Sequence, residues 1–283
     1  MTIRQALQNA AHTLETAGVP DARTDAEWLL AHVTGQSRME LRLAASTELT
    51  REQERRFSSL LLSRAQREPL QYLLGTQNFY GLPIAVDERA LIPRQETEEL
   101  CQWGLSLLEA LPSPQVLDLC TGSGAIAVAL KRLCPRAQVC ASDLSAPALS
   151  LARENARANG ADIRFFLGDL WEPLAGLRFD LIVSNPPYIP SAECGALQAE
   201  VLREPRMALD GGPDGLAFYR RIALGAAAHL NPGGWLLLEV GQGEAADVCC
   251  LLTAAGLADA AVRRDIYGVA RMVGACQRRD SHV

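Results

Sequence analysis

Apolar side chains in residues 1–74 recur every three or four positions, which is the spacing of one face of an α-helix. Thr2 precedes the first of these apolar runs and Thr50 precedes a later one, and both are typical helix-capping residues. Gly18 and Gly35 follow the first two runs, where a helix commonly ends. The pattern therefore predicts a small N-terminal helical domain over residues 1–74.

The pattern changes after residue 74. Short alternating runs on either side of Gly81 indicate a β-hairpin, and we expect residues 75–95 to be the linker. Beyond this point apolar runs of strand length alternate with helical stretches, which is typical of a mostly parallel sheet. Strands are predicted at residues 116–120, 138–142, 163–167, 179–184, 234–240, 260–266 and 268–276. The predicted fold class is α/β, with a doubly wound, mostly parallel seven-stranded sheet in a domain spanning residues 96–283.

Composition restricts the class of protein. Of the 283 residues, 48% are hydrophobic and 21% are charged, as in a globular protein, and no stretch has the apolar length of a membrane span. The N-terminus lacks the apolar segment of a signal peptide, so we expect a cytoplasmic protein that does not contact membranes. A net charge of −6 argues against stable nucleic-acid binding.

The eight cysteines and four histidines do not form a metal-binding pattern. Only Cys249 and Cys250 are close neighbours, no Cys-x-x-Cys pair exists, and no histidine has a metal-ligand spacing from a cysteine. We therefore expect free, mostly buried thiols and no metal.

A glycine-rich turn, Asp118-Leu119-Cys120-Thr121-Gly122-Ser123-Gly124, follows the first predicted strand of the sheet. Its glycines allow a ligand to approach the backbone, and Asp143 ends the next strand, where a carboxylate binds ribose hydroxyls. Dinucleotide sites and S-adenosylmethionine sites share this pairing. The full dinucleotide pattern is absent because Ala127 occupies its last glycine position, and Asp118 would repel a pyrophosphate but suits a cationic methionine group. The turn favours S-adenosylmethionine, with a purely structural glycine turn as the alternative.

A second candidate is Asp169-Leu170-Trp171, which follows the third predicted strand of the sheet. In the same ligand geometry Asp169 would accept a hydrogen bond from the adenine amino group, and Leu170 or Trp171 would pack on the ring. The alternative is that Trp171 is a core residue and Asp169 a turn residue.

The third candidate is Asn185-Pro186-Pro187-Tyr188, at the end of the fourth predicted strand of the sheet. Two prolines end the strand, which fixes one amide and one aromatic ring at its carboxyl end. The Asn185 side-chain oxygen and the Pro186 carbonyl are two acceptors that suit the N–H groups of a planar amide, with Tyr188 stacked on its face. Methyl transfer to that nitrogen would be an in-line displacement that depends mainly on positioning. The alternative is a surface turn that Asn185 merely starts.

Together these residues resemble the release-factor glutamine N5-methyltransferases, and the similarity covers nearly the whole chain. The segments that carry it are Asp118 to Ala127, Asp143, Asn185 to Ile189 and Glu204-Pro205 to Tyr219-Arg220, together with Ile92 to Glu98 between the two domains. The resemblance implies a Rossmann-like, S-adenosylmethionine-dependent methyltransferase whose N-terminal helices dock the protein substrate. The implied substrate is the glutamine in the Gly-Gly-Gln motif of peptide chain release factors.

The resemblance also implies the positions of the ligands. The cofactor would lie on Cys120, Thr121, Gly122, Ser123, Gly124, Asp143, Asp169, Leu170 and Asn185, and the substrate glutamine on Asn185, Pro186, Pro187 and Tyr188. Two positions depart from the family pattern: Cys120 stands where the family usually has Gly, and Glu96 where it commonly has Asp. The first departure bears on how closely the methionine end approaches the loop.

Two alternative functions remain open at this stage. Asn-Pro-Pro-Tyr also marks methyltransferases that act on adenine amino groups in DNA or RNA, although the net charge and the neutral helical half argue against that substrate. The other alternative is a non-catalytic, methyltransferase-like binding subunit, against which the intact glycines, Asp143 and Asn185 count.

Overall fold

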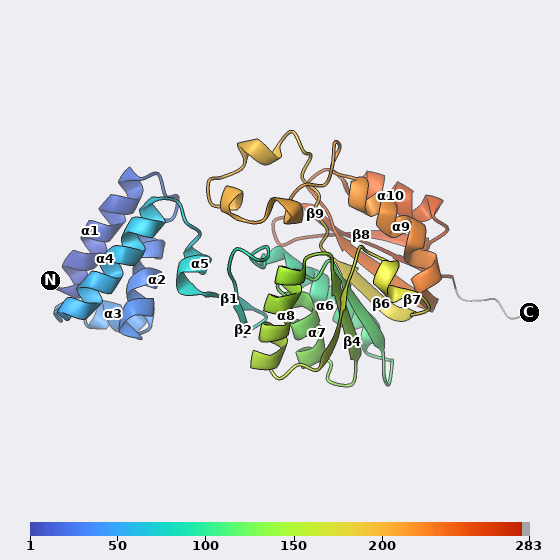
Figure 1. Ribbon diagram of the computed structural model, residues 1–283, viewed down its shortest axis with the longest axis horizontal. Coiled ribbons are helices and arrows are strands. Elements are labelled where there is room, and N and C mark those ends of the chain that lie inside the picture. Colours follow the sequence, from blue (N-terminus) through green and yellow to red (C-terminus); the bar gives the residue numbers. More distant parts are fainter. Residues whose placement is uncertain (279–283) are drawn as a thin grey trace, which may run out of the picture. The chain divides into compact units, whose positions relative to one another are not determined.

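The computed structural model describes residues 1–278 and divides them into two compact units (Figure 1). One unit comprises residues 1–76 together with the short segment 198–203. The other comprises residues 77–197 and the chain from residue 204 onward. None of the helices within the described residues is long and apolar enough to cross a membrane.

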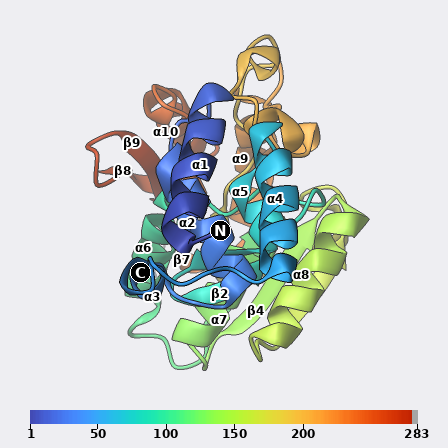
Figure 2. The same cartoon turned by 90° about the vertical axis from the view of Figure 1, so that its left-hand side faces the viewer.

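The first unit is helical, as the sequence predicts. Its helices are α1 (Ile3–Thr16), α2 (Ala22–Thr34), α3 (Arg38–Leu43), α4 (Arg51–Ala65) and α5 (Leu70–Leu74). Capping boxes at Thr2, Ser37 and Thr50 begin α1, α3 and α4, since each side chain accepts a hydrogen bond from the backbone three residues ahead. Helices α1, α2 and α4 lie side by side in both views (Figures 1 and 2) around a shared apolar core.

A buried arginine joins segment 198–203 to the helices of the same unit. Arg64 is 4% exposed and lies 2.7 Å from both Asp25 and Glu200, and Arg67 makes a second ion pair with Glu200. Burial alone would raise the pKa of Glu200, but hydrogen bonds from Arg67 and Arg64 lower it to about 2. The charge of Arg64 is thus compensated by two carboxylates, as a buried cation requires.

The predicted hairpin consists of β1 (Thr76–Phe79) and β2 (Leu82–Ala85) and, apart from Thr76, belongs to the second unit. The main sheet of this unit has seven strands in the order β5-β4-β3-β6-β7-β9-β8. The strands are β3 (Gln115–Leu119), β4 (Gln138–Asp143), β5 (Ile163–Leu167), β6 (Phe179–Ser184), β7 (Leu230–Glu239), β8 (Ala258–Arg264) and β9 (Ala270–Cys276). Five strands are parallel and β9 and β8 are antiparallel to their neighbours, which confirms the predicted fold class.

Helices cover both faces of this sheet. They are α6 (Glu96–Leu108), α7 (Ala125–Leu133), α8 (Ala146–Ala158), α9 (Ala217–His229) and α10 (Ala245–Ala254). Successive side chains of β7 point to opposite faces: Leu236 packs in a core with α9 and α10, whereas Leu237 lies against Gly104 of α6. Burial on both faces explains why the central strands are continuous apolar runs.

The parallel strands bring three candidate segments to one edge of the sheet. Strand β3 pairs with β4 on one side and with β6 on the other, so the order in which successive strands are added to the sheet reverses at β3. Ligands of doubly wound sheets bind at the carboxyl ends of the strands beside such a switch point. The glycine-rich turn, Asp143 and Asn185 all follow or end these strands.

Several strand boundaries differ from the sequence prediction by one to four residues. Strand β7 begins at Leu230 rather than Gly234, with an irregular register opposite β6, and β8 begins at Ala258. Pro69 precedes a separate short helix, α5, after α4 has already ended at Ala65. All eight cysteines are free thiols, but Cys250 is exposed.

Candidate functional site

A cavity opens at the carboxyl ends of β3, β4 and β6, entirely within the second unit. Cys120 to Ser123 of the glycine-rich turn, Asp143, Leu170 and Asn185 all line it. The full lining is Phe79, Arg89, Ala90, Leu91, Pro93, Arg94, Thr97, Leu119, Cys120, Thr121, Gly122, Ser123, Ala125, Ile126, Ser142, Asp143, Leu144, Ser145, Ala148, Gly168, Asp169, Leu170, Asn185, Pro187, Pro205, Met207, Ala208 and Phe218. The structure therefore gathers candidates that are up to 65 positions apart, counting from Cys120 to Asn185, around one space.

The glycine-rich turn adopts left-handed backbone conformations. Cys120, Gly122 and Gly124 have φ angles of 61°, 55° and 81°. A Cβ on Gly122 would meet only the Ala90 side chain, at 3.9 Å, so this backbone faces open space. A Cβ on Gly124 would lie 2.9 Å from the Cβ of Ala152 in α8, so this glycine permits close packing of the helix. The two glycines thus serve different purposes, one toward the cavity and one toward α8.

Asp118 lies beneath the turn and does not line the cavity. Its Oδ2 accepts hydrogen bonds from Thr121 Oγ1 at 2.5 Å and from the Ala127 backbone N–H at 3.0 Å, while its Oδ1 is buried without a partner. Burial raises the pKa of Asp118 to about 7, against the effect of those hydrogen bonds. This carboxyl group fixes the turn to the first turn of α7, and a cation bound above it would favour its charged form.

Asp143 lines the cavity at the end of β4. Its two oxygens accept backbone N–H groups from Gly122, at 2.8 Å, and from Ser145, also at 2.8 Å. A carboxylate has about four acceptor positions, so lone pairs remain for two hydroxyl groups of a ligand. Burial raises the pKa of Asp143, which a hydrogen-bond-donating ligand would offset.

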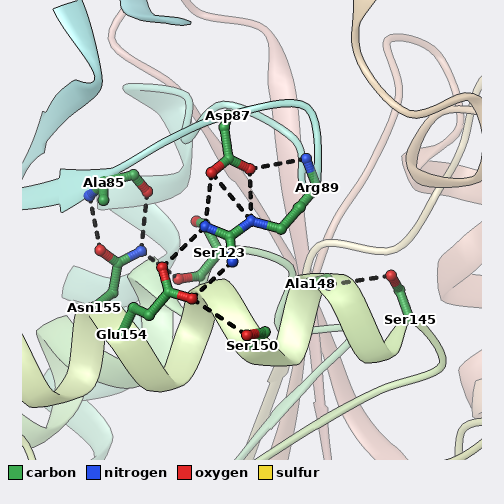
Figure 3. A network of polar contacts seen from close by, with 9 residues as sticks. All are labelled: Ala85, Asp87, Arg89, Ser123, Ser145, Ala148, Ser150, Glu154 and Asn155. Atoms are coloured by element: carbon green, nitrogen blue, oxygen red, sulfur yellow. Dashed lines mark hydrogen bonds and ion pairs between the residues drawn. The ribbon is translucent and has the colours of Figure 1, made fainter.

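A buried amide and an ion-pair cluster hold the wall of the cavity (Figure 3). Asn155 of α8, 1% exposed, accepts from the Ala85 N–H at 2.7 Å and donates to the carbonyls of Ala85 and Ser123 at 3.0 and 2.9 Å. Arg89, which lines the cavity, pairs with Asp87 and Glu154 at 2.7 Å each. Asn155 therefore connects the hairpin, α8 and the glycine-rich turn.

The segment after β5 separates into residues that face the cavity and one that does not. Asp169 and Leu170 line the cavity, and Asp169 also pairs with Arg221 at 2.7 Å. Trp171 lies against α9 instead: its ring stacks on His229 with centroids 4.5 Å apart, and its Nε1 donates to the Arg221 carbonyl. Of the two residues expected to cover an adenine, Leu170 is thus the one at the cavity.

The Asn-Pro-Pro-Tyr segment begins where β6 ends. Asn185 and Pro187 line the cavity, whereas Pro186 is buried and Tyr188 packs against the core that contains α9 and α10. Burial raises the pKa of Tyr188 to about 12, so its hydroxyl stays protonated at neutral pH. Ile189 follows and forms a parallel bridge with Asp210, which holds the segment against the loop that returns to α9.

Sequence reasoning missed the cavity wall built from residues 89–94 and 205–208. Glu204, 5% exposed, joins these two stretches: it accepts the Ile92 N–H at 2.9 Å and pairs with Arg94. The signals in the sequence were the family resemblance of Ile92 to Glu98 and of Glu204-Pro205 to Tyr219-Arg220. Neither indicated that the two segments meet.

These residues suit S-adenosylmethionine. The open backbone at Gly122, the spare acceptors of Asp143 and the apolar contact surface of Leu170 match a nucleoside with vicinal hydroxyls and a flat base. The unpaired Oδ1 of Asp118 beneath the turn matches a positive charge rather than a pyrophosphate.

Cys120 has a left-handed backbone conformation, which predicts a measurable strain. Both Cys120→Gly and Cys120→Ala remove the thiol, but only glycine removes the cost of a Cβ at φ 61°. We expect Cys120→Gly to be more stable than Cys120→Ala by about 1 kcal/mol. Urea unfolding of the two variants measures the difference, and equal stabilities would show that the backbone here is unstrained.

Comparison with known proteins identifies the family of the chain. Residues 5–75 match the PrmC N-terminal domain and residues 102–215 match the methyltransferase small domain. The chain is 46% identical over 274 residues to a release factor glutamine methyltransferase of Geobacter sulfurreducens, covering 96% of each protein. It is 44% identical over 275 residues to that of Deinococcus radiodurans, covering 97% of this chain and 98% of the relative.

Solved structures share the fold at low sequence identity. The hMettl16 catalytic domain, solved in complex with the MAT2A 3'UTR hairpin 6, has a TM-score of 0.59 and 18% identity, over 79% of this chain and 83% of that one. A methyltransferase from Pyrococcus furiosus has a TM-score of 0.52 and 18% identity, over 70% of this chain and 90% of that one. From the full-length relatives and the two matched domains, the chain belongs to the release factor glutamine methyltransferase family.

Proposed function

We propose that this protein transfers a methyl group from S-adenosylmethionine to the side-chain amide nitrogen of the glutamine in the Gly-Gly-Gln motif of peptide chain release factors. The observation that carries the proposal is the position of Asn185. Its amide lines the same cavity as the glycine-rich turn and Asp143. A carboxamide bound at Asn185 would therefore lie beside a cofactor bound on the turn.

The cofactor would be held by three residues that line the cavity. Asp143 would accept hydrogen bonds from the ribose hydroxyls, the backbone at Gly122 would face the methionine part, and Leu170 would pack on the adenine. S-adenosylmethionine, when bound, supplies a methyl carbon activated by the adjacent sulfonium. The Thr121–Asp118 hydrogen bond keeps the turn in the shape that this binding requires.

The substrate amide would be held by two acceptors. The side-chain oxygen of Asn185 and the carbonyl of Pro186 would accept its two N–H groups, which aims the nitrogen lone pair at the methyl carbon. Tyr188 does not line the cavity and would contribute by fixing this segment against the core that contains α9 and α10. No strong base is required, because the proton can leave after the nitrogen has attacked.

Binding of the release factor would also involve the N-terminal helical unit. This unit carries exposed apolar side chains, including Trp28, Met39, Leu43 and Leu62, which are between 44% and 83% exposed. Its nine arginines are balanced by nine acidic residues over positions 1–74, which suits a protein surface better than nucleic acid. The proposal places the enzyme in the cytoplasm, where release factors act.

The proposal is tested by incubating the purified chain with S-adenosylmethionine and a release factor and mapping the product by mass spectrometry. We expect one added methyl group on the Gly-Gly-Gln glutamine and none on a release factor in which that glutamine is alanine. Parallel reactions with DNA and RNA address the adenine alternative. Methylated adenine, or methylation at another protein residue, would contradict the proposed substrate.

A further inference from the structure

Two buried residues from other elements, Thr97 and Glu239, lie next to the side chain of Asn185. Strands β6 and β7 are parallel with Ser184 opposite Leu238, so the next residues along, Asn185 and Glu239, are also neighbours. Thr97 enters from the first turn of α6. Thr97 is 4% exposed and Glu239 3% exposed. Thr97 and Asn185 both line the cavity, whereas Glu239 does not.

The hydrogen bonds among these three residues have a direction. Thr97 Oγ1 donates to Glu239 Oε2 at 2.6 Å, and Asn185 Nδ2 donates to Thr97 Oγ1 at 3.4 Å. A hydroxyl group has one proton and two acceptor positions, so donating to Glu239 leaves Thr97 as an acceptor for Asn185. The Asn185 amide nitrogen therefore donates its hydrogen bond to Thr97, on the protein side, rather than to a ligand in the cavity.

We propose that Thr97 and Glu239 are positioning residues: they bind the Asn185 amide by its nitrogen and thereby present its oxygen to the cavity. This inference rests on the proposed role of Asn185 as an acceptor for the substrate amide. The opposite orientation would present an N–H donor, which repels the N–H groups of a carboxamide. Thr97 and Glu239 thus select for a substrate that donates hydrogen bonds.

The ionisation of Glu239 determines which way the chain of hydrogen bonds runs. A carboxylate can only accept from Thr97, but a protonated Glu239 can donate to Thr97, whose own proton is then free to bind the Asn185 oxygen. Burial raises the pKa of Glu239 to about 7, although the hydrogen bonds from Thr97 and Asn185 favour the charged form. The other groups that face Glu239 are Glu96 and Cys101 on α6, Arg271 on β9, Tyr219 on α9 and Tyr188.

Two Thr97 variants test the proposal. Thr97→Val keeps the shape but removes the hydroxyl, and we expect kcat to fall about 10- to 100-fold while KM for the release factor changes less. Thr97→Ser restores the hydroxyl and should recover most of the lost kcat. Ser106→Ala removes a hydroxyl from the same helix, where it bonds only to the Trp103 carbonyl, and serves as the matched control.

A pH profile separates positioning from a merely structural role. Because the pKa of Glu239 is about 7, kcat of the wild type should decrease as the pH falls below that value. Glu239→Gln cannot ionise, so the part of this decrease that Glu239 causes should be lost, and any part that remains belongs to Asp118, whose pKa is also about 7. A wild-type profile that is flat between pH 6 and 9, or a Glu239→Gln profile that superimposes on that of the wild type, would overturn the proposal.

The last measurement does not depend on the substrate. In the full chain labelled with ¹⁵N-asparagine, the side-chain amide signal of Asn185 is assigned by its loss in Asn185→Ala. We expect this signal to shift with pH around 7 in the wild type and to move in Thr97→Val but not in Ser106→Ala. An Asn185 signal that is identical in the wild type and Thr97→Val would overturn the proposal. If the signal shifts while no release factor is methylated, the proposed substrate fails and the positioning role stands.

Discussion

Replacing Asn185 by alanine should lower the rate of release factor methylation by about 100-fold or more. The reason is that the variant loses one of the two acceptors that aim the substrate nitrogen, and misplacement of about 1 Å can cost that much in rate. Because Asn185 is only half buried and lies after β6 ends, the protein should still fold. Single-turnover methylation followed by mass spectrometry measures the effect.

The matched control is Asn231→Ala. Asn231 also hydrogen-bonds through its amide, to Asp180 at 2.7 Å, but it lies at the start of β7 and does not line the cavity. This variant should methylate at close to the wild-type rate. Calorimetry with S-adenosylmethionine should show binding by both variants. A rate for Asn185→Ala close to that of the wild type would remove Asn185 from the mechanism.

Replacing Gly124 by alanine should lower the free energy of unfolding of the second unit by about 2–4 kcal/mol. The new Cβ would lie 2.9 Å from the Cβ and 3.1 Å from the Cα of Ala152, and the backbone at φ 81° is costly for any residue with a side chain. Because Cα of Ala152 belongs to the backbone of α8, the clash cannot be relieved by a rotamer change. Denaturant unfolding of the full chain measures the loss.

Two further variants separate the clash from the backbone strain. Gly122→Ala has a similar φ of 55° but a Cβ with room, so it should cost only about 1–2 kcal/mol of stability while weakening cofactor binding. Gly124→Ala combined with Ala152→Gly removes the clashing methyl group. The double variant should therefore be more stable, by about 1 kcal/mol, than the sum of the two single losses predicts. Strictly additive losses in the double variant would refute close packing of α8 on Gly124.

The positions of helices and strands followed closely from local patterns. Helix α7 spans Ala125–Leu133 and strand β5 spans Ile163–Leu167, as the apolar periodicity predicts. Capping by Thr2 and Thr50 also acts over only three residues. Such features are encoded by neighbours in the chain, so a single sequence reveals them.

The residues of the candidate site that lie at the carboxyl ends of strands could be predicted from the sequence. The glycine-rich turn, Asp143 and Asn185 could be assigned because parallel strands deliver their carboxyl ends to a single edge. The sequence could not place Trp171 on α9 rather than at the cavity, since an aromatic residue beside a strand end suits either environment. The left-handed conformation of Cys120 was equally hidden, because only the closure of the turn imposes it.

The sequence by itself determined the helical N-terminal region, the alternating strands and helices, and the motifs at the strand ends, because each depends on the order of residues within a short window. Only the tertiary structure decided that Thr97, Asn185 and Glu239 meet, and that Asn155 joins Ala85 to Ser123. These partners are 32 to 142 positions apart. Their contact depends on the order of strands in the sheet and on the packing of α6 and α8, and neither leaves a local pattern in the chain.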